Sequence, residues 1–118
     1  MKNLNDQLSH CTGTENYYKT LNPLIYITDG VKEGCDLGQC HWFLDIVVTQ
    51  NMRDSIRTEP FQTWKLFRKG KDTDKAFIEA TDGDENVIFK QTIPYTDFEY
   101  DEFVIWVTQG YAILPSEY

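Results

Sequence analysis

The sequence predicts an α+β domain in which N-terminal helices pack on a C-terminal antiparallel β-meander of four to five strands. Two observations indicate this class. Segments that favour helix, with capping residues beside them, lie before residue 53. From residue 60 onward, short runs of alternating apolar and polar residues are separated by turn signals. The 118 residues fit one domain, 1–118, and 41% hydrophobic residues suffice for a core.

The first part of the chain gives weaker signals. Residues 1–11 are expected to form either a flexible arm or a short helix. The stretch that follows is rich in turn residues, and Pro23 ends any helix there. Residues 24–28 ("LIYIT") contain isoleucine, tyrosine and threonine, which favour a short strand.

Two helices are predicted next. Thr28 or Asp29 can cap a helix that Gly38 ends. Residues 39–52 fit a helix with a narrow polar stripe, because polar residues recur every four positions, but they also alternate as in a strand. Length favours the helix, whereas a run of β-branched residues favours the strand.

The remaining sequence predicts strands. Residues 82–86 ("DGDEN") have the chemistry of a hairpin loop, and Pro94 ends the strand after it. Trp64 and Leu66 should share one face of their strand. The expected strands are 61–69, 76–81, 87–93, 103–107 and 111–114.

Charge and composition restrict the function. The net charge is −8, and residues 76–118 hold nine acidic residues against one basic residue. Such a surface repels phosphate, so direct nucleic-acid binding is not expected, although 61–71 interleaves aromatic and basic residues. No apolar run approaches about 18 residues and no signal peptide is recognisable, so we expect a cytoplasmic protein without a membrane partner.

Cysteine and histidine residues form one candidate site. An odd number of cysteines without a secretion signal indicates reduced thiols. Zinc would need ligands from two distant pairs, and chain neighbours rarely chelate one ion together. We therefore expect no metal and no cofactor. The residues concerned are His10, Cys11, Cys35, Cys40 and His41.

An acidic row is the second candidate. In an extended chain, Asp97, Glu99 and Asp101 would share one side at intervals of about 6.7 Å, near the phosphate repeat of an extended nucleic-acid strand. With Glu102 they could occupy a basic groove made for DNA or RNA. The alternative is a charged edge that prevents strands from aggregating.

Several short stretches, taken together and in order, resemble a family of small bacterial, phage and plasmid proteins described as a domain of unknown function. The resemblance covers residues 12–118. It implies a single-domain fold and a mobile-element setting, and it implies no catalytic residue. The stretches are "GTENYY" (13–18), "YITDGV" (26–31), "CHWFLD" (40–45), "FQTWKL" (61–66), "IPYTDF" (93–98) and "LPSEY" (114–118).

The "GTENYY" stretch has two interpretations. Gly13 permits a tight turn that Thr14 caps, and the tyrosines then pack on the sheet. Alternatively, the stretch contributes to a pocket for a small ligand or for acid–base catalysis. The residues of that pocket would be Glu15, Tyr17, Tyr18, Asp29, His41 and Asp45.

The sequence favours a non-enzymatic binding protein that acts on a macromolecular partner. Its acidic surface suits a basic protein or a nucleic-acid-binding complex. The most concrete form of this hypothesis is a mobile-element inhibitor of a host nucleic-acid-handling complex. A small enzyme or small-ligand binder is the alternative, and homo-oligomerisation is compatible with either function.

Overall fold

The computed structural model describes residues 3–12, 16–68, 75–96 and 98–118. Helices and strands are mixed, with most helices before most strands, as the sequence predicts. The elements are α1 (Leu4–Gln7), β1 (Tyr17–Lys19), β2 (Tyr26–Thr28), α2 (Asp29–Gly38), α3 (His41–Gln50), α4 (Asp54–Arg57), β3 (Phe61–Phe67), β4 (Ala76–Thr81), β5 (Val87–Ile93), β6 (Glu102–Thr108), β7 (Tyr111–Ile113) and the 3₁₀ turn η1 (Pro115–Glu117).

The strands of the described chain form one seven-stranded sheet in the order β1-β2-β7-β6-β3-β4-β5. The expected meander of four to five strands is therefore too small. The five C-terminal strands are present, but β1 and β2 extend the sheet, and β2 pairs with β7 in parallel. The meander is also interrupted, because β6 pairs with β3 instead of with β5. This position makes β6 the central strand, which suits its apolar sequence.

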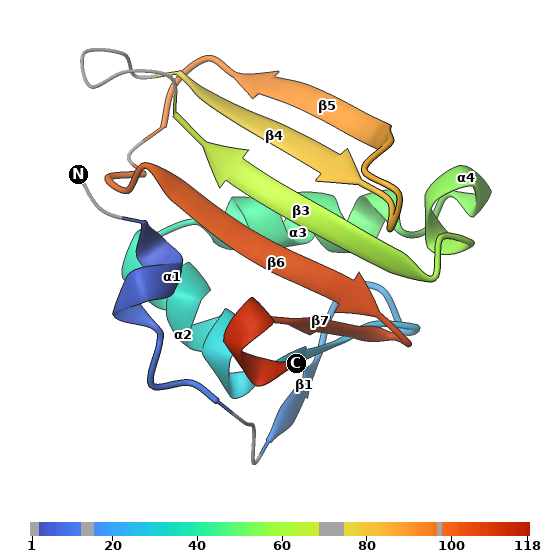
Figure 1. The fold of residues 1–118 in the computed structure, drawn as a ribbon, viewed down its shortest axis with the longest axis horizontal. Coiled ribbons are helices and arrows are strands. Elements are labelled where there is room, and N and C mark those ends of the chain that lie inside the picture. Colours follow the sequence, from blue (N-terminus) through green and yellow to red (C-terminus); the bar gives the residue numbers. More distant parts are fainter. Residues whose placement is uncertain (1–2, 13–15, 69–74, 97) are drawn as a thin grey trace.

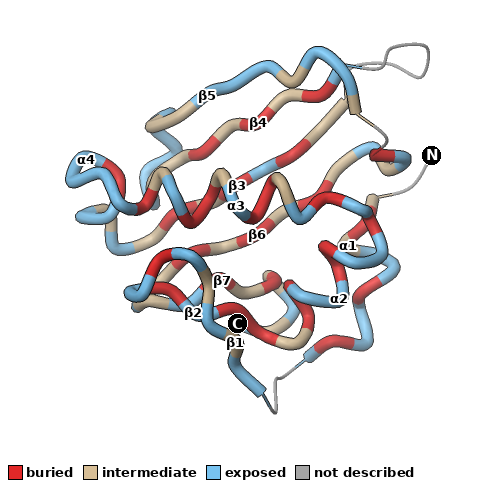
Figure 2. Tube along the Cα trace, turned by 180° about the vertical axis from the view of Figure 1, so that it is seen from behind, coloured by how far each residue is buried: buried red, intermediate tan, exposed pale blue. Residues whose placement is uncertain are grey.

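Helices cover only one face of the sheet. Figure 1 shows the strands in front with α3 behind them, and Figure 2, seen from the opposite side, shows α3 in front of the sheet with α1 and α2 alongside it. Burial alternates along β3, β4 and β6, so every second residue faces the helices. Trp64 and Leu66 are both on the buried face, as predicted. In the described part of the chain, no α-helix lies over the other face of the sheet, and the short 3₁₀ turn η1 packs on it near β7 (Figure 1).

The core lies between the helical layer and this buried face. Phe43 of α3 meets Phe103 of β6 edge-on, with ring centroids 6.0 Å apart. Helix α2 approaches the same strand closely, because a Cβ atom at Gly34 would lie 2.6 Å from the Phe103 ring. Glycine is therefore required at position 34 for α2 to pack against β6.

A buried polar network joins α3 to β3. The Gln62 amide nitrogen donates to Asn51 at 2.8 Å, and the Asn51 amide nitrogen donates back to Gln62 at 3.0 Å. The indole N–H of Trp64 donates to the Gln62 amide oxygen at 2.8 Å. Since buried polar groups are costly without partners, this network fixes how the segment after α3 lies on the sheet.

The N-terminal segment completes the edge of β6. Strand β7 pairs only with residues 106–108 of β6, which leaves the first part of β6 without a strand on that side. The Asn5 side chain occupies this position: its amide donates to the Val104 carbonyl at 3.0 Å, and its amide oxygen accepts from the Val104 N–H at 2.7 Å. Helix α1, which is the short helix of the two alternatives for residues 1–11, therefore serves as a cap for the sheet.

Helix α2 begins as the sequence predicts. The Thr28 hydroxyl accepts a hydrogen bond from the Val31 N–H at 3.3 Å, which is an N-cap bond. The helix ends at Gly38, and Gln39 takes the left-handed conformation just after it. The ambiguous stretch 39–52 contains helix α3, with its polar stripe outward. None of the helices in the described part of the chain has the length and apolar character that crossing a bilayer requires.

Candidate functional site

The uncovered face of the sheet, which we call the open face, is the candidate functional site. It carries the residues of β3, β4 and β6 that alternate with the buried ones, together with parts of β1, β2 and β7 and the C-terminal Tyr118. An unusual number of these side chains are aromatic and partly or fully exposed. They are Tyr17, Tyr26, Phe61, Phe67, Phe77, Trp106, Tyr111 and Tyr118.

Three of these rings form an aromatic triangle where the start of β3 lies beside the end of β6. Phe61 and Trp106 lie on neighbouring strands with centroids 5.2 Å apart. Tyr118 follows η1 and approaches both rings edge-on, at 6.0 Å from Phe61 and 5.5 Å from Trp106. Tyr118 is 74% exposed, so the triangle is open to solvent on one side. Large exposed rings of this kind are typical of binding surfaces.

A second aromatic group lies where β1, β2 and β7 meet. Tyr17 and Tyr111 have ring centroids 5.0 Å apart, and Tyr26 lies 6.2 Å from Tyr111. All three residues are exposed. The parallel pairing of β2 with β7 sets Tyr26 opposite Tyr111. Tyr17 therefore belongs to a surface aromatic cluster in the structure.

A hollow of about 450 Å³ adjoins the aromatic triangle. Phe61 and Lys65 of β3 line it, together with three carboxylates from β4 and the following hairpin loop, Glu79, Asp82 and Glu85. Hydrogen bonds, the largest from the Asn86 backbone, lower the pKa of Asp82, so this carboxyl group stays charged at neutral pH. The hollow is therefore a shallow, mostly anionic depression beside an aromatic ring.

Part of the predicted acidic row borders the same face. A smaller hollow of about 320 Å³ is lined by Asp101 and Glu102 on one side and by Lys65 and Glu79 on the other. The Glu102 carboxylate pairs with the Lys65 ammonium at 3.4 Å, which offsets the charge of this lysine. Arg68 also lines this smaller hollow, so its two cations lie among three carboxylates, and the larger hollow is the more anionic of the two.

The acidic row is not a regular strand in the structure. Asp97 lies outside the described residues. Glu99 and Asp101 are exposed in an irregular segment, and only Glu102 belongs to a strand. Phe98 is buried and anchors this segment to the core. The row is thus anchored, but the even spacing of an extended chain is absent after Phe98.

The residues predicted to form a pocket are only partly brought together. Tyr18 donates its hydroxyl to Asp29 at 2.7 Å, and the Asn16 N–H donates to the same carboxylate at 3.2 Å. The hydrogen bond to Asp29 raises the pKa of Tyr18. The Lys32 ammonium lies 5.4 Å from the Tyr18 ring centroid. Glu15 lies outside the described residues.

Two further members of that set lie elsewhere. His41 begins α3 and pairs with Asp36 at 2.6 Å, near the end of α2. Since Asp36 is two helical turns beyond Asp29, His41 and Asp29 are separated by about 10 Å along α2. Asp45 is exposed one turn further along α3. The structure therefore does not join His41 and Asp45 to the tyrosines.

Glu117 is the residue of this region that sequence reasoning missed. Its carboxylate accepts from the Thr28 hydroxyl at 2.6 Å, from the Gly30 N–H at 3.3 Å and from the Leu114 N–H at 2.9 Å. It therefore places a negative charge at the N-terminus of α2, where the helix dipole favours it. Two features of the sequence could have indicated this role of Glu117: the glutamate in the closing "LPSEY" stretch and the helix cap in the "YITDGV" stretch.

The five metal-ligand candidates of the sequence do not gather. Cys35 and Cys40 are fully buried near each other, and the hydrogen bond between them, with burial, raises the pKa of Cys35. His41 is occupied with Asp36. His10 and Cys11 lie together on the other side of α2, where both contact Glu33.

A family model with the description "Family of unknown function (DUF6876)" matches residues 2–118 of the chain. The chain belongs to the DUF6876 family. The match spans nearly the whole sequence, which agrees with the resemblance seen in the short stretches. A search of curated proteins and a search of solved structures found no match.

In this DUF6876 chain, three of the stretches that carry the resemblance meet at one point. "GTENYY" contributes Tyr18, "YITDGV" contributes Thr28 and Asp29, and "LPSEY" contributes Glu117. Gly30 fits here because a Cβ atom would lie 2.8 Å from the Glu117 carboxylate. These contacts tie the two ends of the domain to the start of α2. For Tyr18 they therefore favour a structural role over a role in a ligand pocket.

Proposed function

We propose that this DUF6876 protein is a non-enzymatic binding protein that holds a basic macromolecular partner on the open face of its sheet. One observation carries the proposal. Among the described residues no α-helix lies over the open face, and its exposed aromatic side chains are bordered by carboxylates. Aromatic residues with a charged rim are the usual composition of a protein–protein interface.

The chemistry of the larger hollow selects the kind of group that the partner presents. Phe61 offers a ring face or edge, and Glu79, Asp82 and Glu85 offer carboxylates around it. An arginine side chain satisfies both, because its planar guanidinium stacks on aromatic rings and forms paired hydrogen bonds with carboxylates. The net charge of −8 attracts a basic surface over longer distances.

The same charges support one class of partner. Basic surfaces rich in arginine are typical of proteins that handle nucleic acids. The proposed partner is such a protein, and inhibition of a host nucleic-acid-handling complex in a mobile-element setting is the narrower form of the proposal. Asp101 and Glu102 adjoin the hollows, so the acidic stretch extends the surface that the partner would contact.

The first experiment uses an arginine-rich peptide as the probe and follows amide chemical shifts by NMR. We expect shifts to concentrate on β3, β4, β6 and the hairpin loop 82–86, and binding to weaken with salt. Removing two carboxylates, Glu79→Gln with Glu85→Gln, should weaken binding at least about fivefold. Tyr118→Ala should weaken it as well, because Tyr118 is an exposed member of the triangle.

The matched controls lie on the helical side. Asp45→Asn removes one exposed carboxylate there, and Met52→Ala removes one exposed apolar side chain. Neither should change binding. The same panel, immobilised and exposed to a bacterial lysate, should retain a basic protein only while the open face is intact. The proposal is wrong if the helical-side variants lose binding as much as the open-face variants, or if no variant changes it.

A further inference from the structure

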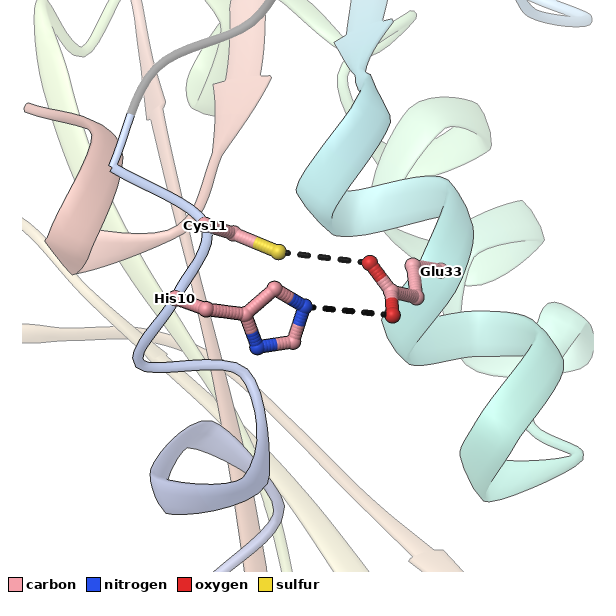
Figure 3. Close-up of side chains that lie close together, drawn as sticks. All are labelled: His10, Cys11 and Glu33. Atoms are coloured by element: carbon pink, nitrogen blue, oxygen red, sulfur yellow. Dashed lines mark hydrogen bonds and ion pairs between the residues drawn. The ribbon is translucent and has the colours of Figure 1, made fainter.

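A second cluster lies apart from the open face, between the N-terminal segment and α2. Figure 3 shows His10 and Cys11 pointing toward Glu33 from the same side of the helix. The His10 Nε2 atom is 3.3 Å from Glu33 Oε1, and the Cys11 Sγ atom is 3.3 Å from Glu33 Oε2. One potential ligand atom from each residue lies within 4.8 Å of the other two.

These separations match those of ligands around one metal ion. With bond lengths of about 2.0 Å for nitrogen and oxygen and about 2.3 Å for sulfur, tetrahedral ligand atoms lie about 3.3 to 3.6 Å apart. His10 and Cys11 each lie 3.3 Å from Glu33, through different oxygens of its carboxylate, and one ligand atom from each of the three residues lies within 4.8 Å of the others. Side-chain rotations that shorten the longest of these separations would bring the three atoms around one ion.

The objection that chain neighbours rarely chelate together does not apply to this backbone. Residues 8–10 form a turn, in which the Cys11 N–H donates to the Leu8 carbonyl at 2.9 Å. The Cys11 carbonyl accepts from the Ser116 hydroxyl at 2.6 Å. These bonds hold the backbone so that the side chains of both His10 and Cys11 face α2 (Figure 3). Glu33 is fixed on the middle of that helix.

The charges around the thiol favour a cation. Three carboxylates, Glu33, Glu117 and Asp29, act on the Cys11 thiol and disfavour a bare thiolate there. The same carboxylates that disfavour the bare thiolate would stabilise a divalent ion placed beside it. His10 and Glu33 are exposed, so the ion has a path from solvent.

We propose that His10, Cys11 and Glu33 bind one divalent transition-metal ion of the zinc class, with the fourth position taken by water. The ligand set of imidazole, thiolate and carboxylate suits zinc and cobalt better than magnesium or calcium. Binding converts the Cys11 thiol to a metal-bound thiolate and releases its proton to solvent. The ion would fasten the N-terminal segment to α2.

Cobalt(II) is the probe for the test, because its absorption reports both thiolate ligation and tetrahedral geometry. Reduced protein is titrated with Co²⁺ without oxygen, and Zn²⁺ is then added. We expect one ion per chain, a thiolate-to-cobalt charge-transfer band, and loss of that band when zinc displaces cobalt. Zinc should also raise the unfolding temperature of the wild-type protein.

Matched variants assign the ligands. His10→Asn and Glu33→Gln should each weaken cobalt binding at least about tenfold. Cys11→Ser should abolish the charge-transfer band. The controls are His41→Asn and Asp36→Asn, which alter the exposed histidine–carboxylate pair at the far end of α2 and should leave the titration unchanged.

Circular dichroism of each variant separates ligand loss from unfolding. Three outcomes would overturn the proposal. The wild-type protein could give no charge-transfer band, the band could survive in folded Cys11→Ser, or the control variants could lose binding equally. None of these outcomes concerns the open face, so the proposed metal site and the proposed partner surface are tested independently of each other.

Discussion

Replacement of Gly30 by alanine should destabilise the protein only while Glu117 is present. A Cβ atom at position 30 would lie 2.8 Å from the carboxyl carbon and from both carboxylate oxygens of Glu117. The carboxylate can move away, but it then gives up its bonds to the Thr28 hydroxyl and to two backbone N–H groups. In a helix without this neighbour, alanine is preferred over glycine.

The magnitudes follow from these contacts. Glu117→Ala removes three charge-assisted hydrogen bonds from a half-buried site, which we expect to cost about 2–3 kcal/mol of unfolding free energy. Gly30→Ala should cost about 1–2 kcal/mol in the wild-type protein, because it displaces the same carboxylate. In the Glu117→Ala background, Gly30→Ala should instead stabilise by up to about 1 kcal/mol. The expected coupling free energy between the Gly30→Ala and Glu117→Ala substitutions is therefore about 2 kcal/mol.

Urea unfolding of the four proteins, followed by circular dichroism, measures this cycle. Equal m-values are needed for the comparison, because they show that the same surface is exposed in each case. If the two substitutions are additive within about 0.5 kcal/mol, the carboxylate does not depend on the space left by Gly30, and the reasoning is refuted.

Two single variants and the Cys11 thiol of the wild-type protein provide further tests. Gly34→Ala should cost about 1–3 kcal/mol in urea unfolding, because its Cβ would meet the Phe103 ring at 2.6 Å; an unchanged midpoint would contradict this packing. Gln62→Leu should cost about 2–4 kcal/mol in thermal unfolding, since it leaves the buried indole N–H of Trp64 without its acceptor; a neutral effect would mean that water replaces the amide. Cys11 should react slowly with iodoacetamide at pH 8, because its pKa is about 11 in place of the ordinary 9.0. The folded state binds the Cys11 thiol proton more tightly than the unfolded chain does. The free energy of unfolding therefore includes a contribution from this thiol that is present below pH 9 and is lost as the pH rises toward 11. Urea unfolding midpoints measured across that pH range would detect the loss.

Elements with local signals could be predicted from the sequence. The Thr28 cap, the end of α2 at Gly38 and the hairpin loop 82–86 each depend on residues within a few positions of one another. The pairing of β2 with β7 could not be predicted, because parallel strands 85 positions apart leave no shared local pattern. Strand β1 was missed for a related reason, since three residues in a turn-rich stretch give little periodicity.

The open face was only partly visible in the sequence. The alternation in 61–69 already assigned Trp64 to the core, and it therefore also assigned Phe61 to the other face. The contact between Phe61 and Trp106 depends on the register of β3 against β6. The sequence does not show that these strands are neighbours, because β6 does not pair with the strand that precedes it in the chain. Glu33 illustrates the same limit: it lies in a helix of mixed composition, and only the position of the N-terminal turn makes it a partner of His10 and Cys11.

The pairing of β2 with β7 has a consequence during synthesis. The hairpin of β1 and β2 leaves the ribosome early, but the strand that attaches it to the rest of the sheet is made only when translation reaches residues 111–113. Until then the early hairpin is a two-stranded fragment, which has marginal stability in water. A chain that stops before Tyr111 should therefore be degraded or captured by chaperones, and completion of the fold should be a late, all-or-none event.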